Sequence, residues 1–149
     1  MGSPATLATW TAGLVTRSGE ETERAAEAFA ALLPPDTVLA LEGDLGAGKT
    51  TFVRGLVRGL GVTGDITSPS FALLNVYEGR RQVFHVDAYR LTQPEAFDDL
   101  LIWDLAKSPW NVIVEWPEKV AARLPLARWQ MKTAILADGG HRFQLTLAG

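Results

Sequence analysis

The sequence predicts an α/β fold in three layers, with a central mixed sheet that is mostly parallel and a β-hairpin at the C-terminus. Three observations lead to this prediction. A short apolar run at residues 38–42 leads directly into a glycine-rich loop and then into an amphipathic helix at 49–60. Two further short strands are expected at 82–86 and 111–115. The first is followed by Asp87 and the second ends in Glu115, so each leads to a carboxylate. In the last segment, 129–147, apolar and polar residues alternate on both sides of an Asp-Gly-Gly turn, which predicts a β-hairpin.

Local signals set the expected boundaries in the N-terminal part of the chain. Residues 1–17 carry scattered apolar side chains, which predicts an extended lead-in with an edge strand. Ser18 followed by Glu21 forms a capping box, and an apolar stripe comes after it. We therefore expect a helix over residues 18–33, which ends where Pro34 begins a pair of prolines.

The middle of the chain predicts a second hairpin and another helix. Strands at 71–77 and 82–86 flank the short turn Glu-Gly-Arg-Arg. A helix is expected over residues 94–106, which start with proline and carry apolar side chains at Phe97, Leu100, Leu101 and Leu105. Since no internal repeat or linker interrupts the chain, we expect residues 1–149 to form one domain.

Composition narrows the chemistry that the chain can perform. Its 149 residues are 47% hydrophobic and 21% charged, as in an ordinary globular domain. With no cysteine and two histidines, a disulfide framework, a thiolate nucleophile and a cysteine-based zinc site are excluded. A net charge of -3 gives no global positive field for nucleic acid, so contact with RNA is expected only through partners. Without a signal peptide or a long apolar stretch, a cytoplasmic location is expected.

The glycine-rich loop at residues 43–50 matches the phosphate-loop pattern of Gly, four residues, Gly, Lys and Thr. Its glycines let backbone N–H groups approach phosphate oxygens at the start of a helix. Lys49 supplies a charge to the β- and γ-phosphates, and the Thr50 hydroxyl is placed to bind Mg²⁺. Because a strand precedes the loop and a helix follows it, the sequence predicts a P-loop NTPase-like fold that binds ATP and magnesium.

Phosphoryl transfer on such a loop needs a carboxylate at a strand end, and two residues qualify. Asp87 and Glu115 close short apolar strands, and parallel strands would bring both to the phosphate side. Taken alone, each of these residues fits the role of a helix cap or a surface acid as well as that of a ligand. Residues 67–71, Thr-Ser-Pro-Ser-Phe, stand where many P-loop proteins sense the γ-phosphate, although a proline-fixed turn explains them equally well. His85 is interpreted as a strand residue whose ring is hydrogen-bonded to a neighbouring residue, rather than as a base.

Five motifs in order make the chain resemble the TsaE (YjeE) family, small bacterial ATPases of threonylcarbamoyladenosine modification of tRNA. The resemblance runs from about Ser18 to the C-terminus. It rests on Glu-Glu-Thr at 20–22, the loop at 43–51, Thr-Ser-Pro-Ser-Phe at 67–71, His-Val-Asp-Ala-Tyr-Arg-Leu at 85–91 and Glu-Trp-Pro at 115–117.

The resemblance implies roles for individual residues. It makes Lys49 a phosphate ligand, Thr50 and Glu115 the ligands of Mg²⁺, and Asp87 a residue needed for turnover. The nucleotide contacts that it implies are Thr22, Asp44, Leu45, Gly46, Ala47, Gly48, Lys49, Thr50, Thr51 and Trp116. It also implies two partners, a metal-dependent threonylcarbamoyl transferase and its sugar-kinase-like companion, whose complex is reset when ATP is hydrolysed to ADP and phosphate.

The chain departs from the family pattern in three places. Ser70 replaces the usual Thr and keeps a hydroxyl, whereas Ala88 replaces the usual Leu. The third expected helix lacks a glycine near Leu100 and Leu101. These departures affect local packing rather than the site.

Other P-loop functions are weighed against the ATPase. A GTPase is excluded, because the chain has neither an Asn-Lys-x-Asp motif nor an Asp-x-x-Gly motif after its second carboxylate strand. A small-molecule or nucleotide kinase remains an alternative, with Asp87 as the base for an acceptor hydroxyl and Arg80 and Arg81 as the sole candidates for an arginine lid. A third alternative is a nucleotide-gated assembly module with little turnover, in which ATP orders residues 67–71.

Overall fold

The structure, a computed structural model, describes residues 5–44, 46, 48–64 and 73–147. The strands are β1 (Leu14–Thr16), β2 (Thr37–Glu42), β3 (Leu74–Glu78), β4 (Gln82–Asp87), β5 (Trp110–Glu115), β6 (Trp129–Ile135) and β7 (His141–Leu147). The α-helices are α1 (Leu7–Ala12), α2 (Gly19–Phe29), α3 (Lys49–Gly59) and α4 (Ile102–Leu105). Short 3₁₀ helices are η1 (Ala88–Arg90), η2 (Pro94–Leu100), η3 (Pro117–Lys119) and η4 (Ala121–Arg123). Within the described residues, no helix is both long and apolar enough to cross a bilayer.

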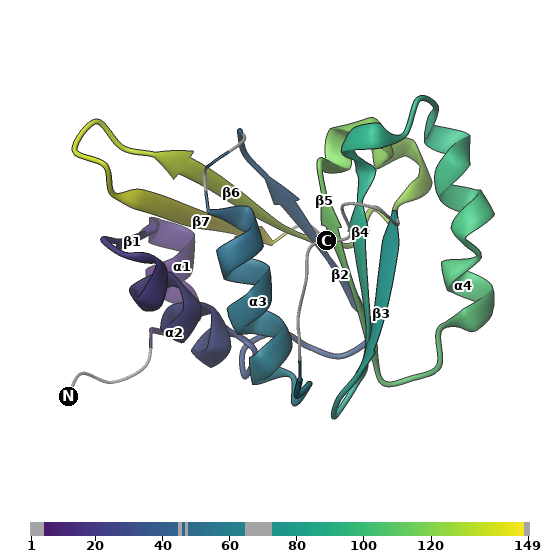
Figure 1. Cartoon of the computed structure of the whole chain (residues 1–149), viewed down its shortest axis with the longest axis horizontal. Coiled ribbons are helices and arrows are strands. Elements are labelled where there is room, and N and C mark those ends of the chain that lie inside the picture. Colours follow the sequence, from purple (N-terminus) through teal and green to yellow (C-terminus); the bar gives the residue numbers. More distant parts are fainter. Residues whose placement is uncertain (1–4, 45, 47, 65–72, 148–149) are drawn as a thin grey trace.

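One seven-stranded sheet, in the order β1-β7-β6-β2-β5-β4-β3, organises these elements (Figure 1). The four inner strands β6, β2, β5 and β4 are parallel to one another. The strands outside them, β3 on one side and β7 and β1 on the other, are joined by antiparallel pairing. The predicted mixed sheet with a parallel centre and a C-terminal hairpin is therefore confirmed.

Helices cover both faces of the sheet and create two apolar cores. Alternating residues of β2 divide between them: Leu39 packs with α1, α2 and α3, whereas Val38 packs with η2, α4 and the segment after β5. The first core includes an aromatic group in which Trp10 lies edge-on to Phe29, with ring centroids 4.9 Å apart. The result is the three-layer arrangement that the sequence predicts.

The predicted helices at 18–33 and 49–60 and the predicted strands appear with small shifts at their ends. Ser18 caps α2 as expected, since its hydroxyl accepts a hydrogen bond from the Glu21 amide at 3.1 Å. The helix ends at Phe29, earlier than predicted, although Leu33 is still buried in the core. The start of the predicted strand at 71–77 lies partly outside the described residues, and β3 begins at Leu74.

The extended lead-in predicted for residues 1–17 is wrong over α1, whereas its edge strand is confirmed as β1. Thr6 caps this helix by accepting a hydrogen bond from the Thr9 amide at 3.4 Å. Six residues are too few to show a helical period, and threonine is a poor helix former. Burial of Trp10, which is 1% exposed, provides the stabilisation that the local sequence lacks.

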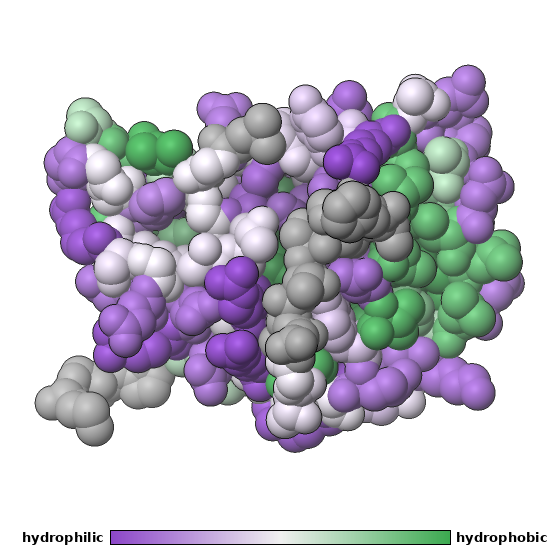
Figure 2. Space-filling model, viewed as in Figure 1, coloured by the Kyte–Doolittle hydropathy of each residue, from purple (hydrophilic) through white to green (hydrophobic). Residues whose placement is uncertain are grey.

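The continuous helix predicted for residues 94–106 is also wrong. The chain forms the 3₁₀ helix η2, turns at Leu101 and then makes the single turn α4. Phe97 and Ile102 point into the core, but Leu101 and Leu105 are half exposed. Apolar side chains therefore gather on the surface around α4 (Figure 2). The spacing of apolar residues in the sequence was misleading, because it includes Leu101 and Leu105, which the core does not bury.

Leu101 lies at the turn where the family pattern suggests a glycine. Its φ of 57° and ψ of 28° are left-handed, a conformation that costs an L-residue about 1–2 kcal/mol. We predict that Leu101→Gly raises the free energy of unfolding by about 0.5–1 kcal/mol, because relief of strain exceeds the added entropy of the unfolded chain. Urea unfolding measures this change. Leu101→Ala removes the same side chain but keeps the Cβ, so an equal gain in both variants would contradict the explanation.

Candidate phosphate-binding site

The parallel centre of the sheet brings the loop and two carboxylates to one edge. The glycine loop follows β2, Asp87 ends β4 and Glu115 ends β5. The register places Asp87 opposite Glu115, and Glu115 in turn opposite Leu41 of β2. Since all three strands point the same way, their carboxyl ends meet at this edge, as expected from the sequence.

Glycine is required at both ends of the loop for different reasons. Gly48 caps α3 with a φ of 93°, a left-handed conformation that turns the chain into the helix. Gly43 lies against β6, and a Cβ at that position would clash with the Thr133 hydroxyl and approach its carbonyl oxygen at 2.7 Å. Gly43 therefore lies close to the hairpin, and α3 begins after Gly48 with no side-chain cap, which leaves its first N–H groups without a partner inside the helix, as anion binding requires.

Lys49 begins α3 and is buried, with 5% of its surface exposed. Its Nζ donates a hydrogen bond to the Gly43 carbonyl at 2.5 Å and lies 3.6 Å from the centroid of the Trp116 ring. Burial lowers the pKa of the Lys49 ammonium, whereas the nearby carboxylates raise it, with Glu115 foremost, followed by Glu118, Asp87 and Asp44. Trp116 reaches this position with a left-handed φ of 59°. One buried cation thus lies among several anions.

Each carboxylate of the pair has a separate hydrogen-bond donor. Asp87 Oδ1 accepts a bond from the Tyr89 amide at 3.0 Å, which fixes it through the backbone of η1. Glu115 is buried, and its Oε2 accepts a bond from His85 Nε2 at 2.6 Å. A carboxylate offers no proton here, so the imidazole nitrogen is the donor. Asp87 is therefore held by a backbone amide, whereas Glu115 is held by the side chain of His85.

These residues line one cavity of about 390 Å³. Its walls are formed by Gly46, Gly48, Lys49, Thr50, Thr51, Asp87, Glu115, Trp116 and His141. Hydroxyl and carboxylate oxygens are the ligands that Mg²⁺ prefers. Within the described residues, no group of three His, Cys, Asp or Glu side chains is placed to hold a metal without help. This donor set fits a magnesium ion that is bound partly by protein and partly by phosphate oxygens.

Other residues with predicted roles lie elsewhere or outside the described part. Asp44 lines a separate cavity beside β6 rather than the main one. Thr22 lines a smaller adjoining cavity of about 100 Å³ together with Gly48 and Thr51. Its hydroxyl is 2.6 Å from the Thr16 hydroxyl and donates to the Ser18 carbonyl. Leu45, Ala47 and residues 67–71 lie outside the described residues.

Two histidines lie at the site: the interpretation of His85 as a hydrogen-bonded strand residue is confirmed, whereas sequence reasoning missed His141. His85 was expected to be satisfied by a neighbour, and that neighbour is Glu115, the candidate metal ligand. His141 begins β7 and lines both the main cavity and the smaller adjoining one beside Gly48. The signal available for His85 was its position two residues before Asp87 on the same strand. The hairpin that carries His141 reaches the site because β6 pairs with β2, which no local pattern reveals.

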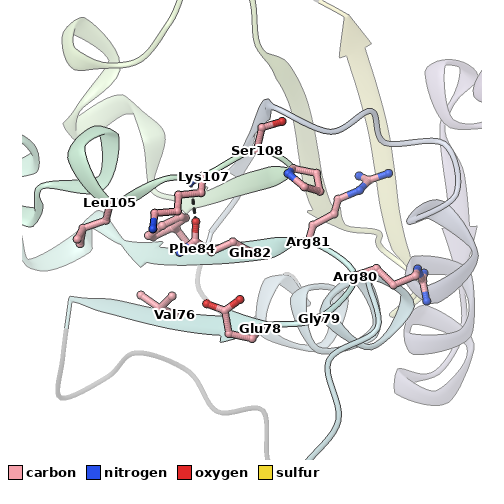
Figure 3. Close-up of a pocket in the computed structure, with 11 residues that line it drawn as sticks. Val76, Glu78, Gly79, Arg80, Arg81, Gln82, Phe84, Leu105, Lys107 and Ser108 are labelled. Atoms are coloured by element: carbon pink, nitrogen blue, oxygen red, sulfur yellow. Dashed lines mark hydrogen bonds between the residues drawn. The ribbon is translucent and has the colours of Figure 1, made fainter.

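A larger cavity of about 590 Å³ lies near the opposite ends of the parallel strands (Figure 3). It contains Arg80 and Arg81, the sole arginines suggested for a kinase lid. Arg80 donates to the Gly59 carbonyl, and Arg81 donates to the Leu33 carbonyl at 2.7 Å. Figure 3 shows both guanidinium groups turned away from the other lining residues. Arg81 also donates to Asn111 Oδ1 at 2.9 Å, so both arginines are held by hydrogen bonds far from the phosphate loop.

The order of strand, glycine loop and helix at the carboxyl edge of a parallel sheet defines a P-loop protein of the NTPase-like class. Residues 16–142 match the family described as "Threonylcarbamoyl adenosine biosynthesis protein TsaE". The chain therefore belongs to the TsaE family.

Individual relatives agree with this assignment. The tRNA threonylcarbamoyladenosine biosynthesis protein TsaE of Treponema pallidum is 40% identical over 134 residues, which cover 90% of this chain and 98% of the relative. The TsaE protein of Bacillus subtilis is 36% identical and is covered to 84%. The crystal structure of Bacillus subtilis YdiB superposes with a TM-score of 0.76 at 31% identity, covering 92% of this chain and 85% of that one.

The close approach of Gly43 to β6 can be tested by substitution. We predict that Gly43→Ala lowers the free energy of unfolding by about 2–4 kcal/mol, because the Cβ clashes with Thr133 and the backbone φ of 154° becomes strained. Gly46→Ala is the control, since its nearest neighbour lies 3.9 Å away and only strain of about 1–2 kcal/mol is added. Thermal unfolding compares the two. Equal losses would contradict the packing of the loop against β6.

Proposed function

We propose that the chain is an ATPase of tRNA threonylcarbamoyladenosine biosynthesis, which binds ATP with Mg²⁺ and hydrolyses it to ADP and phosphate. The observation that carries this proposal is the convergence of Lys49, Thr50, Asp87 and Glu115 on one cavity at the start of α3. Membership of the TsaE family supports the pathway. The chemistry of the four side chains supports the reaction.

The charge balance of the site supports a requirement for magnesium. Lys49 interacts with four carboxylates, those of Glu115, Glu118, Asp87 and Asp44. A triphosphate that entered this environment with Lys49 alone would meet a net negative charge, and like charges repel more strongly in a partly buried site. Thr50 and Glu115 are the residues that would hold magnesium, which would supply the positive charge that removes this repulsion.

The protein groups divide the remaining work. The N-terminus of α3 binds phosphate oxygens, and Lys49 leaves the Gly43 carbonyl to contact the β- and γ-phosphates. Asp87 orients the attacking water, and its hydrogen bond from the Tyr89 amide keeps it in place. Within the described residues, the cavity wall includes no arginine to stabilise the transition state. We therefore propose a low intrinsic rate that a partner raises, since an arginine supplied in trans is worth several powers of ten.

The partners proposed from the family are a threonylcarbamoyl transferase and its sugar-kinase-like companion. Hydrolysis in this scheme resets their complex between cycles, and tRNA is contacted only through the complex. The net charge of -3 supports the indirect contact. The compartment proposed for this work is the cytoplasm, where tRNA is modified.

The two alternative functions make different predictions about the fate of phosphate. The placement of Arg80 and Arg81 argues against a kinase, because neither guanidinium is near the phosphate loop. An assembly module depends on residues 67–71, which lie outside the described residues. The rate of ATP hydrolysis therefore distinguishes an assembly module from an ATPase.

We predict that Lys49→Ala abolishes ATP hydrolysis and weakens nucleotide binding, because the phosphates lose a buried positive charge. Phosphate release and calorimetric titration with a non-hydrolysable ATP analogue measure the two effects. Lys107→Ala is the matched control, since this exposed lysine lines the cavity at the other end of the sheet. Intact hydrolysis in Lys49→Ala would show that the site is assigned to the wrong residues.

ATP labelled at the γ-phosphate tests the reaction itself. We predict that the label appears as free phosphate, slowly for the chain alone and faster when the partner complex is added. Thin-layer chromatography of the products follows the label. Transfer to a metabolite would establish a kinase, and a rate that partners leave at background would favour an assembly module.

A further inference from the structure

A buried imidazole lies directly behind the candidate metal ligand. His85 is 1% exposed on β4, and its Nε2 donates to Glu115 Oε2 at 2.6 Å. The parallel register pairs His85 with Ile113, two residues before Glu115. Because residues two apart on a strand share a face, His85, Asp87 and Glu115 all lie on the face of the sheet that α3 covers.

Stability alone gives a poor account of His85. Its second ring nitrogen, Nδ1, is buried and has no hydrogen-bond partner among the described residues. A buried polar atom without a partner costs about 1–3 kcal/mol, and an aliphatic residue at this strand position would avoid that cost. The ring therefore contributes something that apolar packing does not provide. Among the described residues, the ring makes one hydrogen bond, which is to Glu115.

We propose that His85 is a positioning residue, which orients the Glu115 carboxylate toward the metal that accompanies the nucleotide. This inference rests on the proposed magnesium site. With Oε2 held by the imidazole, the carboxylate cannot turn freely about its last torsion, so its second oxygen keeps one direction relative to the cavity. Hydrogen-bond partners behind a metal ligand tune affinity in this way, and their loss costs about 10–100-fold.

The two carboxylates of the site are held by different kinds of hydrogen-bond donor. Asp87 is fixed by the backbone amide of Tyr89, which no side-chain substitution removes directly. Glu115 depends on a side chain, so substitution of His85 releases one carboxylate and leaves the other in place. The expected consequence is a loss of metal affinity, while binding of the nucleotide without metal is preserved.

The test is a titration with Mn²⁺ followed by electron paramagnetic resonance, using the full chain with a non-hydrolysable ATP analogue. We expect His85→Leu to weaken Mn²⁺ binding about 10–100-fold. His85→Gln, whose amide can donate to the same oxygen, should restore most of the affinity. Binding of the analogue without metal should not change in either variant. If His85→Leu does not fold, His85→Asn replaces it, because its shorter side chain should bind Mn²⁺ more weakly than His85→Gln.

Two further variants separate the possible causes of failure. Phe84→Leu is the control for a disturbed β4, since Phe84 is equally buried but packs in the opposite core, and its Mn²⁺ affinity should match that of the unaltered protein. Glu115→Gln should weaken Mn²⁺ binding directly. If it does so while His85→Leu binds Mn²⁺ normally, the inference about His85 is overturned and the proposed site stands. If Glu115→Gln has no effect, the metal site itself is wrong.

Discussion

The parallel pairing of β2 with β5 and of β5 with β4 is the constraint on which the site depends. This pairing makes three chain segments, separated by long stretches of sequence, end at one edge of the sheet. It also fixes which side chains face α3, because a slip of one residue would turn Asp87 and Glu115 toward the opposite core. Apolar cores on both faces hold this register, so the geometry of the candidate phosphate site follows from the packing of the sheet.

Electrostatics then adds a second constraint to the one set by the sheet. The pairing that brings Asp87 opposite Glu115 places two like charges on neighbouring strands, which is unfavourable without a cation. Lys49 provides one positive charge and is held by the Gly43 carbonyl and the Trp116 ring. The same excess of negative charge explains why the orientation of each carboxylate matters to the proposed metal site.

The sequence allowed the strands around the site to be predicted, because short apolar runs next to a glycine loop carry a strong local signal. Ser18 as a helix cap and the strand ends at Asp87 and Glu115 were found for the same reason. The helix α1 and the break at Leu101 were missed, since both depend on which apolar residues the core buries. The bond from His85 to Glu115 joins two strands and has no counterpart in local sequence. Composition and spacing predict a phosphate site, whereas the pathway comes from family membership.

A crystal structure of the chain with Mn²⁺ and a non-hydrolysable ATP analogue tests the central claim most directly, since anomalous scattering locates the metal. The account predicts the β- and γ-phosphates at the start of α3, with Lys49 turned toward them. It predicts Mn²⁺ beside the Thr50 hydroxyl and bound to Glu115 directly or through one water. Phosphates in the larger cavity near Arg80, or a metal that contacts neither Thr50 nor Glu115, would contradict it.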